Sequence, residues 1–477
     1  MRSSADLSRA ADNGLPWIQV APGAPYFVTE DGRPWHPVGQ NDAISWDEFQ
    51  GLFRRKDLPA VDRHLAWLAD HGVTCLRLMM EYSQVRHRYL EKPVGRFVPA
   101  MVQLWDDLLA LCGKHGLRCL LTPFDTFWMY LHWRHHPYSR GRGGPCEHPR
   151  EWLTDRSMIE AAKARLSFMV TRWGGSGAIF AWDLWNEMHP AHMGDDPTHF
   201  ASVAAELSGH VRSLELRLYG RARPQTVSLF GPVLYQHPAV ADTIFRHPLL
   251  DFASTHFYDE GTIDWPRNTV DPAVRVGELV REALEHAPPG RPFFDSEHGP
   301  IHFFKDKKKT LPEAFDDEYF RHIQWAHLAS GGAGGGMRWP NRNPHVLTSG
   351  MRKAQKSLAT FLPQLDWTSF RRQNLNEEAR ATGPVRVFAC GDDRQAVAWL
   401  LRTDTVDRET GRLRSDAPPV AIDLEIPGLG DGAYVITPWA TAAGPGGEPF
   451  RVQSRNGRLS LLSLPIATDL ALALQPV

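Results

Sequence analysis

Cysteine is scarce in this chain of 477 residues, and its pattern argues against a disulfide framework. The five cysteines are Cys75, Cys112, Cys119, Cys146 and Cys390, an odd number without a Cys-x-x-Cys spacing. Three of them stand within apolar stretches. Such a set is typical of reduced, buried side chains, because disulfide frameworks use even numbers of cysteines in oxidising compartments. We therefore expect free thiols and a reducing compartment.

The chain also lacks long apolar runs and an excess of charge of one sign. No apolar run approaches the roughly 18 residues that cross a bilayer, and residues 1–14 lack the apolar core of a secretion signal. The formal net charge of -2 gives no general attraction to nucleic acid or to an anionic membrane. We expect a soluble, cytoplasmic protein with no nucleic-acid or membrane partner.

Tryptophan, by contrast, is abundant, with 17 residues in an otherwise globular composition. Indole rings fill protein cores, and exposed indoles bind the flat apolar faces of ligands such as sugar rings. Composition does not separate these two roles. The length exceeds one typical domain, which predicts two domains, one of them large.

Strand and helix patterns alternate along most of the chain. Stretches with helical apolar spacing, two of which end at Gly72 and Gly116, alternate with short apolar runs. The expected strands cover residues 39–41, 73–79, 117–124, 178–187, 226–230, 252–257, 292–297 and 335–339. Strict alternation implies parallel strands joined by crossover helices, and eight repeats predict an α/β fold, a closed (β/α)8 TIM barrel.

The two ends of the chain differ from the barrel pattern. Residues 1–25 are expected to form a lead-in, and an Asp-Gly turn early in the barrel domain, which spans residues 26–367, predicts a hairpin. Across residues 380–477, short strands are separated by Gly, Pro and Asp turns. This last segment predicts a C-terminal antiparallel β-sandwich, an accessory domain.

Two glutamates stand at expected strand ends. The run at residues 178–187 ends abruptly in Asn186 and Glu187, and the run at residues 292–297 ends in Glu297. A buried carboxylate is costly, although a single strand-capping glutamate would carry no function by itself. Because the carboxyl ends of barrel strands share one face, we expect the two glutamates to converge as an acid/base pair.

Four more residues fall at or near expected strand ends: Arg77, His256, Tyr258 and Trp339. A retaining glycosidase needs one carboxyl group to protonate the leaving oxygen and a second, ionised one to attack the anomeric carbon. Arg77 and Tyr258 are suited to keep Glu297 ionised, and the indole of Trp339 is suited to floor a sugar pocket.

Two polar residues close to Glu187 are also candidates for the site. The amide of Asn186 is suited to bind a substrate hydroxyl as charge develops. Asp183 is a candidate buried partner of Arg77, although the sequence does not decide this.

The motifs at these strand ends resemble those of a known family. They are Trp-Asn-Glu at 185–187, Ser-Glu-His-Gly at 296–299, Arg77, the His-x-Tyr of His256 and Tyr258, and Trp339. Together they are similar to the retaining glycoside hydrolases of clan A, closest to glycoside hydrolase family 5. The resemblance implies that Glu187 is the acid/base, that Glu297 is the nucleophile, and that no metal or cofactor is needed. It also implies an oligosaccharide or glycoside substrate.

The chain departs from the family pattern in two places. Family 5 members usually place a histidine at the end of strand three, where this chain has Asp125. The appended β domain resembles the accessory sandwiches of other clan A enzymes, including xylosidases, arabinofuranosidases and mannosidases. The substrate-binding residues that we predict are Asn41, Arg77, Asp125, Trp128, Asn186, His256, Tyr258 and Trp339.

We expect a β-glycosidase with exo action on short β-linked oligosaccharides of gluco or manno type. An insertion at residues 126–150 follows strand three and is placed to close one end of the cleft. An endo-acting cellulase or mannanase, or an arabinofuranosidase or galactofuranosidase, stays open as an alternative. A carbohydrate-binding pseudoenzyme is disfavoured because both carboxylates are present, and the sequence is compatible with a homo-oligomer.

Three further motifs favour structural roles. His132, His135 and His136 lack a Cys or carboxylate that would complete a zinc site, so a loop that walls the cleft is favoured over metal. The glycine-rich run at residues 331–336 lacks the Gly-Lys-Ser/Thr of a phosphate loop, which favours close backbone packing. The basic run at residues 305–309 favours a solvated loop over a site for an acidic substrate.

Overall fold

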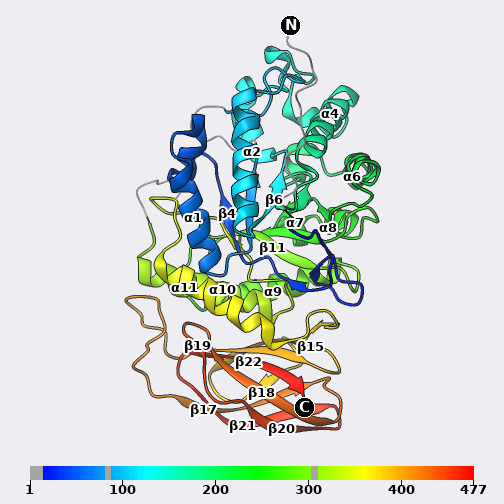
Figure 1. Ribbon diagram of the computed structural model, residues 1–477. Coiled ribbons are helices and arrows are strands. Elements are labelled where there is room, and N and C mark those ends of the chain that lie inside the picture. Colours follow the sequence, from blue (N-terminus) through cyan, green and yellow to red (C-terminus); the bar gives the residue numbers. More distant parts are fainter. Residues whose placement is uncertain (1–13, 81–87, 302–309) are drawn as a thin grey trace.

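The protein consists of a barrel of alternating strands and helices followed by an antiparallel sheet, as a computed structural model shows for residues 14–80, 88–301 and 310–477 (Figure 1). Residues 1–13 of the expected lead-in and the basic run at 305–309 lie outside the described residues. The C-terminal sheet lies below the barrel in Figure 1, in orange and red.

The barrel sheet is parallel throughout its described strands, in the order β8-β7-β6-β5-β4-β12-β11-β10-β9. Only Val227 separates β8 from β9, so these two segments act as one strand and the ring is closed through it. The predicted (β/α)8 barrel is thereby confirmed. The strands are β4 (Gly39–Asp42), β5 (Cys75–Met79), β6 (Arg118–Thr122), β7 (Ile179–Asp183), β8 (Gln225–Thr226), β9 (Ser228–Phe230), β10 (Ala253–Phe257), β11 (Phe293–His298) and β12 (Met337–Arg338).

Crossover helices cover the outside of the barrel, and side-chain caps mark several of their starts. The carboxylate of Asp57 accepts the N–H of Ala60 at the start of α1, and Asp155 accepts the N–H of Met158 at the start of α4. Apolar residues at helical spacing then face the sheet. The helices are α1 (Leu58–Asp70), α2 (Pro99–Lys114), α4 (Arg156–Trp173), α6 (Pro197–Tyr219), α8 (Pro238–Phe245), α9 (Asp271–His286), α10 (Glu313–Ala329) and α11 (Ser349–Phe361).

A small antiparallel sheet closes the amino-terminal end of the barrel. It consists of β1 (Ile18–Val20), β2 (Phe27–Thr29) and β3 (Pro34–Trp35), and the β2–β3 hairpin is the predicted one. β1 lies in the expected lead-in, for which the sequence predicts no regular structure. The ring of Phe27 meets those of Phe180 and Phe252, near the starts of β7 and β10, edge-on at centroid distances of 4.9 and 5.4 Å. The opposite end of the barrel is therefore the one that is free to hold a site.

The C-terminal strands form one antiparallel sheet of ten strands that curls around its own core. Apolar side chains of its two halves, such as Leu474 and Leu459, meet in that core. The predicted antiparallel domain is confirmed, with its layers joined into one sheet. Its strands are β13 (Gln373–Asn374), β14 (Arg380–Ala381), β15 (Val385–Gly391), β16 (Ala396–Arg402), β17 (Val420–Pro427), β18 (Gly432–Ala440), β19 (Gly444–Pro445), β20 (Phe450–Arg455), β21 (Arg458–Ile466) and β22 (Asp469–Pro476).

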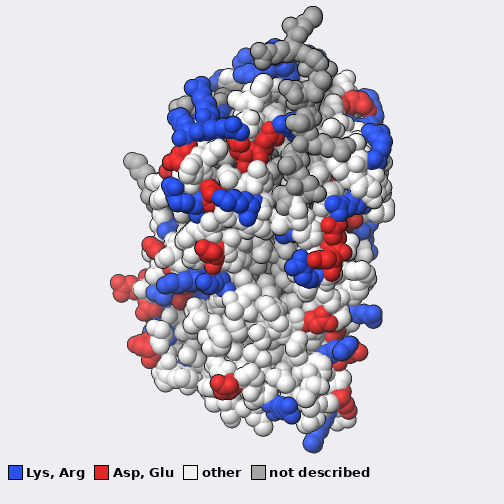
Figure 2. Space-filling view, viewed as in Figure 1, with Lys and Arg blue, Asp and Glu red and all other residues white. Residues whose placement is uncertain are grey.

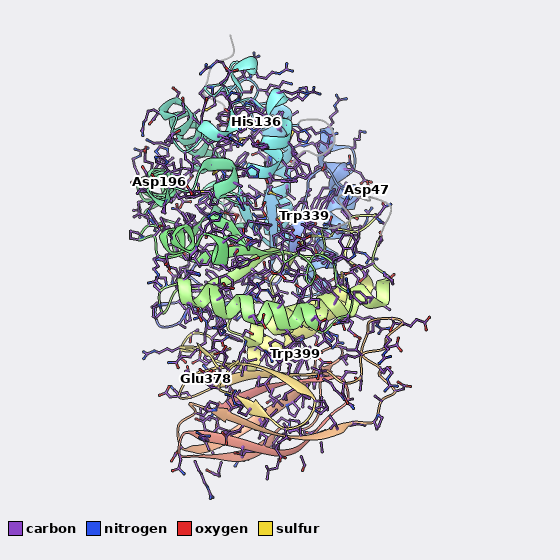
Figure 3. The ribbon with its side chains drawn as sticks, turned by 180° about the vertical axis from the view of Figure 1, so that it is seen from behind. Asp47, His136, Asp196, Trp339, Glu378 and Trp399 are labelled. Atoms are coloured by element: carbon purple, nitrogen blue, oxygen red, sulfur yellow. The ribbon has the colours of Figure 1, made fainter. Side chains whose placement is uncertain are left out.

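The two parts pack against each other through α10. Trp399 of β16 lies at this junction in Figure 3, and its ring is 5.6 Å from that of His322 on α10. Arg321 Nη1 donates to Asp469 Oδ1 at 2.7 Å across the same junction. Phe388 and Trp399 belong to the same continuous core as the barrel residues. The accessory sheet is thus attached by a buried contact rather than by a linker alone.

Both signs of charge are scattered over the face that Figure 2 shows, with fewer charges over the C-terminal sheet than over the barrel. This mixture agrees with the formal net charge of -2. None of the helices within the described ranges is long and apolar enough to cross a bilayer.

Candidate active site

A cleft opens at the carboxyl ends of the barrel strands, and both predicted catalytic glutamates line it. Trp339, which directly follows β12, lies within the barrel region in Figure 3. Its ring meets that of Trp46 edge-on at 5.2 Å. The residues that line the cleft are Met79, Asp125, Thr126, Phe127, Trp128, Asn186, Glu187, His189, His192, Phe230, Tyr258, Glu297, Ile301 and Trp339.

Glu297 lies in β11 and is held between a cation and a phenol. Arg77 Nη1 donates to its Oε2 at 2.8 Å, and Tyr258 Oη donates to its Oε1 at 2.6 Å. Burial raises the pKa of Glu297, while the charge of Arg77 and the Tyr258 hydroxyl act in the opposite direction. Both carboxylate oxygens are therefore bonded to donors that favour the ionised form.

Glu187 follows β7 by four residues, because this strand ends at Asp183 and not at the predicted residue 187. Its backbone adopts a positive φ of 53°, which is uncommon for a residue with a side chain and is concentrated at functional sites. His256 Nδ1 lies 2.8 Å from Glu187 Oε1, and burial lowers the pKa of His256 to about 3. Burial also raises the pKa of Glu187 to about 7. Glu187 is thus suited to carry a proton near neutral pH.

The two carboxyl groups face each other. One oxygen of Glu187, one oxygen of Glu297 and a nitrogen of His256 all lie within 4.8 Å of one another. This trio and the group of Cys146, Glu151 and Asp155 are the sets within the described ranges whose donors are close enough to hold a metal ion. In the trio, both Glu297 oxygens already accept hydrogen bonds from Arg77 and Tyr258.

Arg77 connects the residues beneath the cleft. Its side chain is fully buried, and Nη2 donates to Asp183 Oδ2 at 2.9 Å, so Asp183 is indeed its buried partner. Nη1 also donates to Asn41 Oδ1 at 2.8 Å, and Nη2 donates to Asn186 Oδ1. Asn186 Nδ2 in turn donates to Asp125 Oδ2 at 2.9 Å. One guanidinium therefore fixes the positions of several strand-end side chains.

Asp125 stands where family 5 members usually have a histidine, and it directly precedes the predicted insertion at 126–150. Its Oδ1 accepts the N–H of Trp128 at 2.6 Å and so caps α3 (Thr126–His132), a short helix that was not predicted from the sequence. Burial raises the pKa of Asp125 well above its usual range. The cap directs Phe127 and Trp128 toward the cleft.

A buried polar pair flanks Glu297 on its strand. His298 Nδ1 lies 2.6 Å from Asp295 Oδ2, and Asp295 Oδ1 accepts the N–H of Glu297 at 3.3 Å. Gly336 lies against this pair: a Cβ at Gly336 would come within 3.0 Å of Asp295 Oδ2. His327 accepts the N–H of Asp295 at 3.0 Å. The glycine run is thus closely packed, as predicted, and Gly336 lies against the strand that carries Glu297.

The residues that we predicted to bind substrate fall into two groups. Asp125, Trp128, Asn186, Tyr258 and Trp339 line the cleft. Those that lie beneath it are Asn41, Arg77 and His256, which contact the cleft residues instead.

Four aromatic or imidazole side chains of the cleft were missing from the predicted site residues: Phe127, His189, His192 and Phe230. His192 lies on α5 (Pro190–Met193), a helix too short to produce a helical pattern, and His189 caps it. Phe230 ends β9, so its place at a strand end was the one available signal.

Sequence comparison finds relatives among fungal mannan-degrading enzymes, although no family model matches the chain. A probable mannan endo-1,4-β-mannosidase F of Aspergillus flavus is 26% identical over 206 residues, which is 42% of this chain and 42% of that protein. A probable mannan endo-1,4-β-mannosidase A of the same species is 23% identical over 304 residues, 60% of this chain and 74% of the relative. The match thus spans less than half the length of the first of these relatives.

Structural comparison finds glycoside hydrolases over nearly the whole chain. One glycoside hydrolase has a TM-score of 0.59 at 12% identity and covers 98% of both chains. A family 5 glycoside hydrolase from Bacteroides vulgatus has a TM-score of 0.56 at 13% identity, covering 98% of this chain and 95% of the other. An endo-β-1,4-mannanase from Thermotoga petrophila has a TM-score of 0.51 at 14% identity, covering 90% and 92%. These comparisons confirm the fold and the resemblance to family 5 of clan A.

Proposed function

We propose that this protein is a retaining β-glycosidase that hydrolyses O-glycosidic bonds by double displacement. The observation that carries the proposal is the pair Glu187 and Glu297, with oxygens within 4.8 Å of each other at the carboxyl ends of the strands. Retaining glycosidases hold their carboxyl groups about 5–5.5 Å apart, whereas inverting ones leave about 6.5–9.5 Å for a water molecule. An oxygen–oxygen distance of at most 4.8 Å supports the shorter of these two separations, and with it direct attack by a carboxylate.

The contacts of the two glutamates assign the steps. Ionised Glu297 attacks the anomeric carbon while protonated Glu187 gives its proton to the leaving oxygen, so the glycosidic bond breaks and a glycosyl ester forms on Glu297. Glu187 then takes a proton from a water molecule whose oxygen attacks the same carbon, and Glu297 leaves as a carboxylate. Arg77 and Tyr258 stabilise the charge on Glu297 before and after the cycle.

The proposed substrate is a β-linked oligosaccharide of manno type. The names of the sequence relatives support this choice over a gluco-type sugar. Aromatic rings of Trp128, Phe230 and Trp339 line the cleft and are suited to pack on the faces of pyranose rings. Asn186, beside Glu187, offers an amide for a sugar hydroxyl.

The experiment that tests this function uses a panel of aryl β-glycosides. We expect hydrolysis of the β-mannoside to exceed that of the β-glucoside and of the arabinofuranoside. Proton NMR of the first product should show the β-anomer, and a 2-deoxy-2-fluoro glycoside with a good leaving group should label Glu297, detected by peptide mass spectrometry. Release of the α-anomer would contradict retention, and absence of turnover on the whole panel would contradict the glycosidase assignment.

Exo action is part of the proposal, and α3 supports it. This helix follows β6 and sets Phe127 and Trp128 into the cleft wall, so the insertion at 126–150 occupies the active face. The endo-acting alternative is favoured by the names of the relatives. A soluble mannan should release single sugars from the start with nearly unchanged viscosity; a rapid fall in viscosity with mixed oligomers would establish the endo alternative.

A cytoplasmic location is also proposed, supported by five free, buried cysteines.

A further inference from the structure

We propose that a second hollow beside the cleft binds the distal sugar units on the leaving-group side of the oligosaccharide. This inference rests on the proposed glycosidase function. The hollow, here called the α3 groove, is lined by Tyr130 and Trp133 on one side and by residues 148–151 and 154 on the other. It lies on the surface of the 126–150 insertion and its continuation, a part of the chain that the catalytic steps do not use.

A continuous row of rings joins the cleft to the α3 groove. It starts at Tyr258, which donates to Glu297, and passes to Phe230 at a centroid distance of 5.9 Å and then to His189 at 5.6 Å. His192 follows at 5.8 Å, and the ring of Tyr130 lies 4.7 Å beyond it. All members before Tyr130 line the cleft, and Tyr130 lines the groove. The two hollows are therefore linked by one wall of rings.

The position of Glu187 decides which end of the substrate lies in this direction. The acid protonates the leaving oxygen, so the leaving part of the substrate must lie on its side of the cleft. Burial lowers the pKa of His192, Glu187 acts to raise it, and Arg150 acts to lower it. His192 is thus close to both the acid and a residue that lines the α3 groove, which places the groove beyond the leaving group.

The side chains of the α3 groove suit a neutral sugar ring. Tyr130 is 38% exposed. An aromatic ring at the surface leaves apolar area in contact with water, and a ligand that covers it removes this unfavourable contact. The indole of Trp133 is held in place, because its Nε1 donates to the carbonyl of Glu147 at 2.7 Å and its ring stacks on His136 at 5.7 Å. A fixed ring is a good platform for the C–H face of a pyranose.

The charged groups of the groove are mixed in sign. Arg150 and Glu151 lie together with His148, so the groove offers both donors and acceptors for hydroxyl groups. Such a mixture does not favour an anionic ligand. The ligand chemistry is therefore that of further β-linked, uncharged sugar units of the same chain.

The test compares a six-unit with a two-unit β-1,4-linked manno-oligosaccharide and with an aryl β-mannoside. In Tyr130→Ala we expect KM for the six-unit substrate to rise about 3- to 10-fold, because one stacking contact is lost. KM and kcat for the aryl mannoside should stay unchanged, and Tyr130→Phe, which keeps the ring, should retain the affinity of the parent protein. Trp133→Ala should give the same length-dependent loss.

Leu131→Ala is the matched control, since Leu131 is 56% exposed on the same helix and does not line the groove. It should leave every KM unchanged. An equal KM change for all three substrates, or no change for the six-unit substrate in Tyr130→Ala, would overturn the groove while the glycosidase function stands. If the parent protein hydrolyses none of these substrates, the proposed function fails, and the groove proposal falls with it.

Discussion

At the scale of single residues, the two glutamates differ in their partners. Glu297 accepts from a guanidinium and a phenol, whereas Glu187 faces an imidazole that is neutral at ordinary pH. Glu297 is buried and Glu187 is partly buried, and burial alone would raise the pKa of both. This difference in partners supports the proposed roles, with Glu297 as the nucleophile and Glu187 as the proton carrier.

The dependence of kcat/KM on pH should therefore be bell-shaped. Glu187 must be protonated, so activity should fall as the pH rises through about 7, the pKa of its carboxyl group. Glu297 must be ionised, so activity should also fall at acid pH, where its raised pKa is crossed. The measurement is the pH profile of kcat/KM with a glycoside that has a poor leaving group, whose cleavage needs the proton of Glu187. Glu187→Gln should lose the alkaline limb; a profile with that limb intact would assign it to another group.

Azide should separate the two roles. Glu187→Ala should still form the glycosyl ester from an activated aryl glycoside but lose about 10²- to 10⁴-fold on substrates with poor leaving groups. Azide needs no general base, so it should speed turnover of Glu187→Ala and give a glycosyl azide of retained configuration. Glu297→Ala should have no turnover by this route. A retained azide product from Glu297→Ala would show that the roles are reversed.

At the scale of elements, the glycine run before β12 packs against β11, the strand that carries Glu297. Gly336 has a φ of 74° and lies against Asp295, which accepts the N–H of Glu297. Gly336→Ala should destabilise the protein by about 1–3 kcal/mol and lower kcat about 10- to 100-fold, because Glu297 would move. Urea unfolding and steady-state kinetics measure the two effects.

Gly116→Ala is the matched control for Gly336→Ala. Its φ is 72°, but an added Cβ would meet no atom within 4 Å. Gly116→Ala should therefore lower the free energy of unfolding by only about 1–2 kcal/mol, from backbone strain, and leave kcat unchanged. An equal loss of kcat in both variants would show that Gly336 has no special relation to the nucleophile.

The long elements could be predicted from the sequence, and the short ones could not. The core helices and strands are marked by apolar period and by glycines such as Gly72 and Gly116. Three- to seven-residue elements such as β1, α5 and α3 give no period. The strand expected at 178–187 ends at Asp183 because only isolated bridges continue it, at Asn186 and Met188.

The site was predictable where a residue stands at a strand end. Glu187 and Glu297 were placed correctly on one face because the barrel brings such ends together. The role of Asp295 could not be predicted, because an acidic residue inside an apolar strand does not reveal which groups its side chain contacts. The ring of His192 belongs to a loop helix whose position depends on tertiary contacts alone.

At the scale of the whole molecule, α10 belongs to both parts. Its residue Arg321 donates to Asp469 of β22 at 2.7 Å, and both side chains are nearly buried. Burial would raise the pKa of Asp469, but Arg321 and Thr441 hold it well below its usual range. A lowered pKa stabilises the fold fully above the ordinary aspartate pKa, and this contribution declines as the pH falls below that value until it is gone below the folded pKa.

Arg321→Ala should lower the free energy of unfolding by about 3–5 kcal/mol, because it leaves a buried carboxylate without its partner. Denaturant unfolding followed by circular dichroism measures this. Arg458→Ala removes an exposed partner of Glu425 in the same sheet and should cost at most about 1 kcal/mol. Similar losses in both variants would mean that the junction pair adds no more than a surface pair.

All five thiols are buried, so their chemical modification reports when the surrounding structure opens. Burial raises the pKa of Cys390 to about 12, so a thiol-selective reagent can modify it only in molecules that have opened. Cys390 sits against α10, with its Sγ 3.8 Å from the carbonyl of Leu328, while Cys75 lies in β5. Because both belong to one core, mass spectrometry of pulse-labelled protein should find them modified at the same rate. Faster labelling of Cys390 than of Cys75 would show that the accessory sheet separates from α10 before the barrel opens.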